Sequence, residues 1–328
     1  MTVGSHPARN RVGGALRYAK ASRGSNGLTL VRGGAGFSRY RHRLVSLPVA
    51  GSPRASIGEL PRCEGVTVCP WLRVVFPRAS ASKRFAVIAD VHGNALALEA
   101  VLRDAATRSV DYLINLGDNA NGPLEPARAV GLLRGGGDAF HHVRGNGDRM
   151  VGDPASPATR SALFARDRLR EDDLRWLRDL PRVMAHPDGW LAFHGSPTSD
   201  VAYVVETVLP TGLASRPRAE VAAILSPAQE SLLLCGHTHL PRCVRLDDGR
   251  VVVNPGSVGL PAYDDSSPYP HRVEAGSPDA RYAVIERGGA RWNVELISVP
   301  YDFRAAAEQA RTAGWDEWAY NLETGRCR

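Results

Sequence analysis

Seven polar side chains stand in five short clusters, each where an apolar run meets a glycine-marked turn. The runs and their clusters read IAD-VHGN, INLGDN, VRGNGD, LAFHGS and LLLCGHTH, and the seven side chains are Asp90, His92, Asp118, Asn146, His194, His237 and His239. Side chains at the ends of parallel strands converge on one edge of an α/β sheet, where ligands usually bind. The pattern therefore predicts a single shared site.

The mixture of side-chain types indicates divalent transition metals. Asp, Asn and His together suit such ions better than calcium, which prefers an all-oxygen shell. Seven ligands are too many for one tetrahedral ion, but they fit two ions that share a bridging carboxylate, an arrangement used for phosphoryl hydrolysis. Asp118 is the predicted bridge, because it stands centrally in the series and its carboxylate offers two oxygens.

Taken singly, most of these clusters have an ordinary structural explanation. Asp90 and His92 share one face of a strand and can reach one ion, yet most D-x-H pairs are surface polar residues. A Gly-Asp turn needs no function, and a lone histidine such as His194 is more often a structural residue. The paired histidines of GHTH are the stronger signal, although they too could be exposed turn residues. The prediction of a metal site therefore rests on the order of the five clusters and on their common position at the ends of apolar runs.

The elements that position these residues follow from the apolar pattern. Continuous apolar runs predict buried parallel strands over 84–90, 110–118 and 141–146. Helical spacing predicts helices between them, over 94–106 and 126–134. This β-α-β-α-β beginning is typical of a parallel or mixed sheet.

The remaining pattern predicts one helical region, four strand features and three short helices. The helices fall at 158–180, 218–225, 302–313 and 316–323. The strands form a pair around the turn at 187–189, a buried strand ending in GHTH, a hairpin turning at Asp248-Gly249 and a closing hairpin around 288–289. The polar, Pro- and Ser-rich stretch 262–279 is predicted to be a long loop.

The net charge of +7 belongs to one end of the chain. Residues 1–80 hold 13 Arg or Lys and two Glu, whereas 81–328 hold 28 basic and 32 acidic residues. We therefore expect 1–82 to be a basic extension, disordered or spuriously translated, with a targeting segment or a nucleic-acid or membrane tail as alternatives. Residues 83–328 are expected to form one domain. Nucleic-acid binding is not indicated for that domain.

Cysteine usage and hydropathy favour a cytosolic protein. The five cysteines make an odd count without a CxxC pair, so neither a disulfide framework nor a zinc ribbon is indicated. No apolar run approaches the 18 residues or so of a membrane-spanning helix, which argues against a membrane partner.

The ordered set of clusters resembles the calcineurin-like metallophosphoesterase superfamily. The family pattern is D-x-H, then GD, then GNH followed by D or E, then a single H, then GHxH. In this chain the parts read DVH at 90–92, GD at 117–118, GNGD at 145–148, H at 194 and GHTH at 236–239. The resemblance covers about 83–328, and the opening IADVHGNALALEAVL is especially similar to the small bacterial phosphodiesterase branch.

The resemblance implies a fold, a metal centre and a reaction. The fold would be an α/β/β/α sandwich of two sheets flanked by helices, and the substrate a small phosphoester. Two divalent ions, Mn²⁺ first with Fe, Zn, Ni or Mg as alternatives, would share a hydroxide that attacks phosphorus. One ion would take Asp90, His92, Asp118 and His239, and the other Asp118, Asn146, His194 and His237. Of these, Asp118, Asn146 and His237 are also the expected catalytic residues.

One departure from the family pattern bears on the substrate. Gly147 stands where the family has the histidine of GNH, which helps to protonate the leaving oxygen. Because such acid catalysis is typically worth a factor of about 10²–10⁴, its absence favours phosphodiesters over alkyl phosphomonoesters. Four residues are weak candidates to replace it, with surface or packing roles the better explanation: His141, His142, Asp148 and His271.

Two other functions remain open from the sequence. One is a phosphomonoesterase, including a phosphoprotein phosphatase. The other is a non-catalytic binding protein on the same fold, for which the metallophosphoesterase-like retromer subunit is a precedent, although all seven ligands are intact here. Assembly into a homo-oligomer is also left open.

Overall fold

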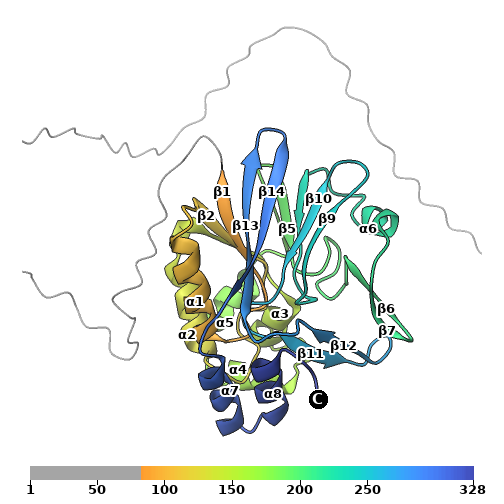
Figure 1. The fold of residues 1–328 in the computed structure, drawn as a ribbon. Coiled ribbons are helices and arrows are strands. Elements are labelled where there is room, and N and C mark those ends of the chain that lie inside the picture. Colours follow the sequence, from red (N-terminus) through yellow and green to blue (C-terminus); the bar gives the residue numbers. More distant parts are fainter. Residues whose placement is uncertain (1–82) are drawn as a thin grey trace, which may run out of the picture. The chain divides into compact units, whose positions relative to one another are not determined.

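Two five-stranded sheets lie face to face in the computed structural model, which describes residues 83–328 (Figure 1). The predicted basic extension over 1–82 lies outside the described residues. Within 83–328, no helix combines the length and hydropathy needed to cross a membrane.

The first sheet begins with the predicted β-α-β-α-β unit. Strands β1 (Arg84–Ile88), β2 (Tyr112–Asn115) and β3 (Phe140–His142) run parallel, and the connecting helices are α1 (Ala95–Ala106) and α2 (Pro126–Gly135). Proline at the first position suits the start of α2, since its missing N–H would have no helical partner there. A short 3₁₀ turn leads from α2 into β3.

The closing hairpin completes this sheet. Strands β13 (Ala280–Gly288) and β14 (Arg291–Val299) pair antiparallel with each other, and β13 also pairs antiparallel with β1. The strand order is β14-β13-β1-β2-β3, so β1 has a neighbour on each side. The mixed sheet predicted from the apolar runs is confirmed.

The second sheet has the order β4-β5-β8-β10-β9. Strands β5 (Trp190–Phe193), β8 (Leu232–Leu234) and β10 (Val251–Pro255) are parallel, while β4 (Val183–His186) and β9 (Pro241–Arg245) pair antiparallel at the edges. The strand pair around the turn at 187–189 and the hairpin turning at 248–249 are both as predicted.

The layers follow from the alternation of side chains along each strand. On β1, Phe85 and Val87 pack between the sheets, whereas Ala86 and Ile88 face α1 and α2. The inter-sheet core also contains residues of the second sheet and of β14, among them Trp190, Leu232, Leu234, Val253 and Trp292. These strands read as continuous apolar runs because both of their faces are buried.

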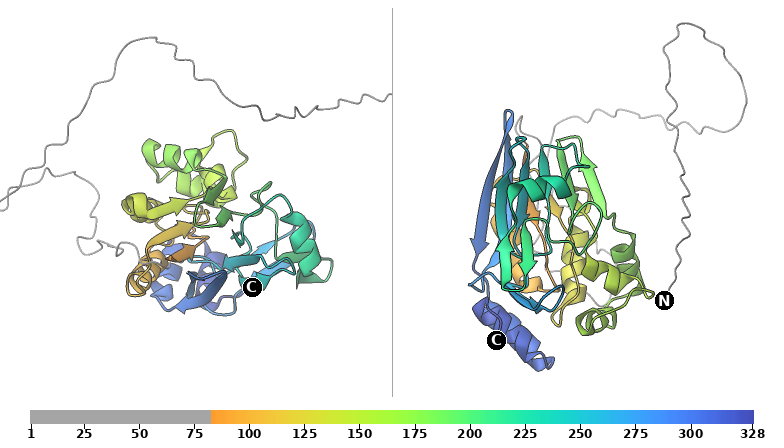
Figure 2. Two further views of the ribbon diagram at one scale, coloured as in Figure 1. Left: turned by 90° about the horizontal axis from the view of Figure 1, so that it is seen from above. Right: turned by 90° about the vertical axis from the view of Figure 1, so that its right-hand side faces the viewer.

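Helix α6 (Arg218–Ile224) covers the outer face of the second sheet, where Val221 packs near Phe193 and Leu233. It lies on the opposite side of the sheets from α1 and α2 (Figures 1 and 2). The order of layers is therefore helix, sheet, sheet, helix, and the predicted α/β/β/α sandwich is confirmed.

The segment predicted as one helix over 158–180 forms two, α4 (Arg160–Arg166) and α5 (Glu171–Asp179). Three acidic residues open α5, where the positive end of the helix dipole stabilises them. The third predicted strand is also shorter than expected, since it ends at His142 and a helix, α3 (Asn146–Gly152), begins at Asn146. Helices α3, α4 and α5 share a small apolar cluster with α2.

The predicted loop over 262–279 is wrong, because it contains a hairpin of β11 (Ala262–Asp265) and β12 (His271–Glu274). Ser266, Ser267, Pro268 and Pro270 lie in its turn, and Ser277 and Pro278 follow β12. A further hairpin, β6 (Glu206–Leu209) with β7 (Gly212–Ser215), has no counterpart among the predicted elements. The two terminal helices, α7 (Phe303–Thr312) and α8 (Asp316–Thr324), form as predicted.

Candidate metal centre

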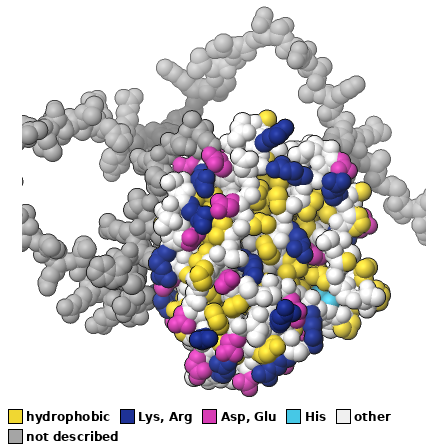
Figure 3. All heavy atoms as spheres, in the orientation of Figure 1, with side chains coloured by type: hydrophobic (Ala, Val, Ile, Leu, Met, Phe, Trp, Pro, Cys, Tyr) yellow, Lys and Arg dark blue, Asp and Glu magenta, His cyan; other side chains and the backbone are white. Residues whose placement is uncertain are grey.

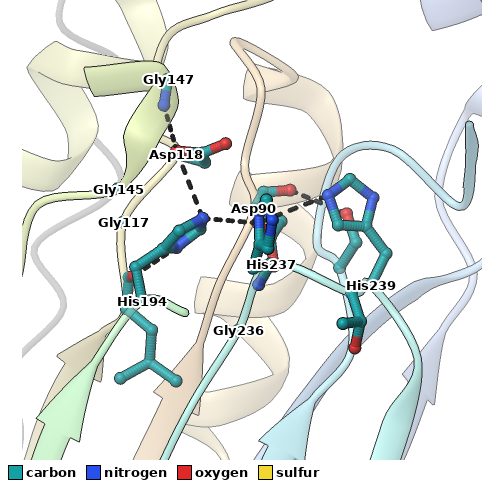
Figure 4. Close-up of polar contacts among 12 residues, drawn as sticks. Asp90, Gly117, Asp118, Gly145, Gly147, His194, Gly236, His237 and His239 are labelled. Atoms are coloured by element: carbon teal, nitrogen blue, oxygen red, sulfur yellow. Dashed lines mark hydrogen bonds and ion pairs between the residues drawn. The ribbon is translucent and has the colours of Figure 1, made fainter. Parts of the chain in front are cut away.

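Five of the seven predicted ligands bring their ligand atoms together at the carboxyl ends of the parallel strands, namely Asp90, His92, Asp118, His194 and His239. The ring of His237 lies 5.1 Å from that of His194, and Asn146 precedes Gly147, whose N–H bonds Asp118 Oδ1. Asp90 and His92 follow β1, Asp118 follows β2, and His194 directly follows β5. His237 and His239 follow β8, and Asn146 is the first residue of α3. Figure 4 shows Asp90 in the middle of the cluster, with His194 on one side and His239 on the other. The parallel strands of both sheets thus deliver side chains to one place.

Two groups of candidate ligand atoms can be distinguished within the cluster. One consists of Asp90, His92 and His239, the other of Asp90, Asp118 and His194, and the ligand atoms of each group lie within 4.8 Å of one another. The Asp118 carboxylate faces both groups, since Oδ1 is 3.5 Å from His194 Nε2 and Oδ2 is 3.9 Å from His92 Nε2. Asp90 Oδ1 is 3.4 Å from His239 Nε2 and 3.8 Å from His194 Nε2.

Backbone carbonyls orient three of the histidines. Each of His92, His194 and His239 directs its Nδ1 atom at a main-chain oxygen, which assigns the proton to Nδ1 and leaves the Nε2 lone pair facing the cluster. The accepting oxygens belong to Asn121 at 2.9 Å, Leu116 at 2.8 Å and Leu260 at 2.7 Å. His237 is turned the other way, with Nε2 donating to a carbonyl at 3.1 Å.

Several buried polar atoms in the cluster have no hydrogen-bond partner. They are Asp90 Oδ1, Asn146 Oδ1 and His194 Nε2. In addition, His92 Nε2 and His239 Nε2 lie 3.1 Å apart. Two neutral rings in this arrangement turn lone pairs toward each other, which a shared cation stabilises. Because buried polar groups are nearly always paired, these residues fit a divalent metal centre.

The backbone at the site adopts an uncommon conformation. Six non-glycine residues within 83–328 have a positive φ, and five of them are candidate ligands: Asp90 at 57°, His92 at 50°, Asp118 at 58°, His237 at 69° and His239 at 55°. Such conformations cost about 1–3 kcal/mol each and cluster at functional sites. The fold therefore sustains a strained backbone at the residues that the sequence singled out.

Electrostatics leave Asp90, His92 and His237 in metal-binding forms, whereas for His194 the charges of Asp118 and Asp90 outweigh burial and raise the pKa. Burial raises the pKa of Asp90, but interactions with the neighbouring His239 and His194 outweigh burial and lower it. Burial, with the charge of His194, lowers the pKa of His237 to about 4. Burial and His239 likewise lower the pKa of His92. At neutral pH, Asp90 is thus ionised and both of these imidazoles are neutral, as metal ligands must be.

Glycines allow the loops that carry Asp118 and Asn146 to approach each other (Figure 4). A Cβ atom on Gly117 would lie 2.3 Å from the Gly145 nitrogen, and one on Gly145 would lie 2.0 Å from Asp118 Oδ1. Neither position can hold a larger residue without moving the backbone. The glycines beside Asp118 and Asn146 were the available sequence signal for this close approach.

Asp148 fastens these loops. Its carboxylate accepts hydrogen bonds from the backbone N–H groups of Asp118, Asn119 and Gly145 and from Asn119 Nδ2, at 2.8–3.0 Å. Burial and the charge of Asp118 raise the pKa of Asp148 to about 7, whereas four N–H donors favour its anion. A structural role accounts for this residue, which was one candidate to replace the missing histidine.

The other three candidates lie in different surroundings. His141 packs among Tyr112, His186 and Trp190, and His142 lies beside Asn115 and the ring of Trp176, so these two do not join the cluster. His271 is nearer, because its Nε2 atom bonds the Tyr203 hydroxyl at 3.0 Å and the Tyr203 ring lies 5.2 Å from the ring of His237.

Two tyrosines that the sequence did not indicate line the histidine side of the site. The Tyr263 hydroxyl donates to the His237 carbonyl at 3.1 Å, and its ring lies edge-on to His239 at 4.6 Å. The hydroxyls of Tyr203 and Tyr263 are 2.7 Å apart. Both residues come from segments outside the family pattern, so nothing in their local sequence marked them.

Comparisons with known proteins agree with this geometry. The family model of the calcineurin-like phosphoesterase superfamily domain matches residues 84–270. The uncharacterized protein MJ0912 of Methanocaldococcus jannaschii is 24% identical over 255 residues, which are 71% of this chain and 94% of that protein.

Two solved structures share the fold. A metallophosphoesterase from Sphaerobacter thermophilus has a TM-score of 0.58 and 26% identity, and the match covers 74% of this chain and 99% of that one. The hypothetical protein PH1004 from Pyrococcus horikoshii OT3 has a TM-score of 0.60 at 19% identity, covering 74% of this chain and 98% of that one. The family match spans more than half of the chain. The chain belongs to the calcineurin-like phosphoesterase superfamily.

Proposed function

We propose that this protein is a phosphoester hydrolase that uses two divalent metal ions and acts on small phosphodiesters in the cytosol. Residues 83–328 would form its phosphoesterase domain. Members of the superfamily generally bind divalent metals. The observation that supports the proposal most strongly is that lone pairs of several buried side chains face one another without a hydrogen donor between them. His92 Nε2 faces His239 Nε2 at 3.1 Å, beside the unpaired oxygen of Asp90.

Each proposed ligand has a defined part. By resemblance to the family, one ion would be held by Asp90, His92, Asp118 and His239, and the other by Asp118, Asn146, His194 and His237. The two groups of nearby ligand atoms, Asp90 with His92 and His239 and Asp90 with Asp118 and His194, support part of each set. Asp118 is suited to bridge them because its two oxygens face different histidines. When bound, the ions would polarise the phosphoryl oxygens and lower the pKa of the attacking water. Manganese is the first choice, although first-row ions compete for such sites.

The residues of the chain orient the proposed metal ligands and limit which leaving groups can depart. The carbonyl bonds fix the ring orientations of His92, His194 and His239, so the ligand set is formed in advance. Gly147 offers its backbone N–H to Asp118 Oδ1 at 2.7 Å, and it has no side chain that could protonate a leaving group. This supports a preference for phosphodiesters whose leaving groups depart without a proton.

Hydrolysis of bis(p-nitrophenyl) phosphate by Mn²⁺-reconstituted protein tests the proposal. We expect turnover that a chelator abolishes, and a loss of about 10³-fold or more in Asp118→Asn, because a two-metal centre contributes most of the transition-state charge stabilisation. Asp138→Asn, at an exposed aspartate that is not among the predicted ligands, is the control and should retain full activity.

Two results would count against this function. Metal-loaded wild-type protein that turns over no member of a panel of phosphomonoesters and phosphodiesters would exclude a hydrolase. Faster turnover of p-nitrophenyl phosphate than of the diester would instead support a phosphomonoesterase.

A further inference from the structure

An ion pair joins helix α3 to the stretch of chain that follows His194. Arg149 lies three residues after Asn146 on this helix. Its Nε and Nη2 atoms donate to the two carboxylate oxygens of Asp200, at 2.7 and 3.2 Å. The two side chains are 32% and 17% exposed, so water shields the pair only in part. Because a planar guanidinium bound at two nitrogens fixes orientation as well as distance, this pair sets the position of Asp200 relative to α3.

Asp200 immediately precedes the residue that orients His237. The Val201 carbonyl accepts a hydrogen bond from His237 Nε2 at 3.1 Å, and within 83–328 this is the only hydrogen bond of the ring. A carbonyl oxygen can only accept, so the proton of the neutral ring lies on Nε2 and the lone pair on Nδ1. The position of Val201 therefore decides which nitrogen His237 offers to a metal ion.

The same stretch of chain folds back on Gly195, the residue after His194. A Cβ atom on Gly195 would lie 2.6 Å from the Ser199 backbone oxygen and 2.9 Å from the Asp200 carbonyl carbon. The turn is thus too close for any residue with a side chain at 195. Asp200 is held against the chain that follows His194 on one side and by Arg149 on the other.

Each of the three guanidinium nitrogens of Arg149 donates a hydrogen bond within the protein. Besides the two bonds to Asp200, Nη1 donates to Ser156 Oγ at 2.9 Å. Burial raises the pKa of Asp200, but the hydrogen bond from Arg149 outweighs burial and lowers it, so the pair is ionised at neutral pH. This geometry favours a role in holding two parts of the chain together over direct contact with a substrate phosphate.

We propose that Arg149 and Asp200 are positioning residues for the second ion, which the proposed function assigns to Asn146, His194 and His237 together with the bridging aspartate. The inference rests on that function. The ion pair connects all three ligands, because it joins the helix that Asn146 begins to the turn that follows His194 and to the carbonyl that orients His237. Ligands held in place before the ion arrives lose little freedom on binding, which raises the affinity for the second ion.

Titration with Mn²⁺ followed by electron paramagnetic resonance tests this role. In wild type, the second Mn²⁺ should convert the signal of an isolated ion into that of a spin-coupled pair. In Arg149→Ala, affinity for the second ion should fall about 10-fold or more, as is typical for the loss of such an outer partner, while affinity for the first ion should be unchanged.

Arg84→Ala is the matched control. Arg84 is 31% exposed and pairs with Glu286 at 3.2 Å, and it begins β1, whereas the cluster follows the last residue of that strand. The change therefore removes an ion pair of similar exposure at the opposite end of the sheet. We expect this variant to bind both ions as wild type does.

The tautomer of His237 is a readout that a general loss of stability does not change. In metal-free wild type, nitrogen-15 NMR of the histidine rings should show His237 protonated at Nε2 alone. Arg149→Ala and Asp200→Ala should each lose this single tautomer, because the Val201 carbonyl is no longer held in place. The double variant should bind the second ion no more weakly than either single variant, since both changes remove the same ion pair.

The outcomes distinguish this inference from the function on which it rests. If Arg149→Ala binds the second ion as tightly as wild type or keeps the single His237 tautomer, the role of the ion pair is wrong and the proposed function stands. An equal loss of affinity for both ions would also overturn that role, in favour of general support of the fold. If wild type binds only one ion, both proposals fail. If wild type binds two ions and the variants behave as expected, but no ester is hydrolysed, the hydrolase function fails and the positioning role stands.

Discussion

His92 and His239 show how single residues prepare this site. In each ring Nδ1 donates to a backbone carbonyl, and the two Nε2 atoms face each other at 3.1 Å. The backbone of both residues is held at a positive φ, which only a well-determined surrounding structure maintains. Ring orientation and strained backbone together explain why the cluster has its shape before any ligand enters.

Asp148 gives a prediction at the same scale. Asp148→Asn replaces an acceptor of four N–H groups by an amide whose own N–H₂ faces some of those donors. We expect the free energy of unfolding of the metal-free protein to fall by about 2–4 kcal/mol, measured by urea denaturation. The control is Asp153→Asn at the other end of α3, because the Asp153 side chain accepts one hydrogen bond, from the backbone N–H of Ala155. This change should lower the free energy of unfolding by about 1 kcal/mol or less. Equal midpoints for Asp148→Asn and wild type would contradict this.

The sequence indicated the proposed ligands but not Tyr203 and Tyr263. Most of the ligands follow apolar strands, so their meeting place follows from strand ends alone. Tyr203 and Tyr263 reach the histidines through contacts between segments far apart in the chain. Those are properties of packing, which no local pattern records.

At the scale of elements, an ion pair ties α2 to α5 behind the helix that carries Asn146. Asp173 near the start of α5 bonds Arg134 of α2 and also Arg170. Both helices share an apolar cluster with α3, whose members include Val130, Val151 and Leu177. The position of Asn146 at the site therefore depends on helix packing as well as on its loop.

This ion pair predicts a pH dependence. Burial raises the pKa of Asp173, but Arg170 and Arg134 outweigh it and hold the pKa below the ordinary 3.8. Because the pKa of Asp173 is lower in the folded state than in the unfolded state, the ion pair stabilises the fold at a pH above the unfolded-state pKa. This stabilisation is lost as the pH falls below about 4. In thermal melts below that pH, wild type should lose stability more steeply than Asp173→Asn. The exposed Asp172→Asn should follow wild type, and parallel curves for all three proteins would contradict the assignment.

The sequence predicted long elements better than short hairpins. Strand β1 and helix α1 carry many buried residues in clear periods. By contrast, β11 and β12 have four residues each and mixed burial, and their hairpin is fixed by pairing rather than by an apolar run. The prediction of one helix missed the break between α4 and α5, where Leu163, Leu169 and Leu174 are six and five residues apart and so depart from helical spacing.

At the scale of the whole molecule, the sandwich brings the ends of two separate sheets together. The inter-sheet core joins Phe85 and Ile114 of one sheet to Trp190 and Leu234 of the other, and this packing sets the distance between ligands that follow β1, β2, β5 and β8. Residues 83–328 hold 28 basic and 32 acidic residues, and Figure 3 shows both signs interspersed on one face. Neither sign of charge dominates that face of the described residues.

The position of bound metal tests the central claim most directly. Anomalous diffraction from crystals soaked in Mn²⁺ should show two peaks about 3.5–4 Å apart, one beside His92 and His239 and the other beside His194 and Asn146, with Asp118 between them. A single peak in the cluster, or manganese bound only elsewhere on the molecule, would contradict the two-metal account.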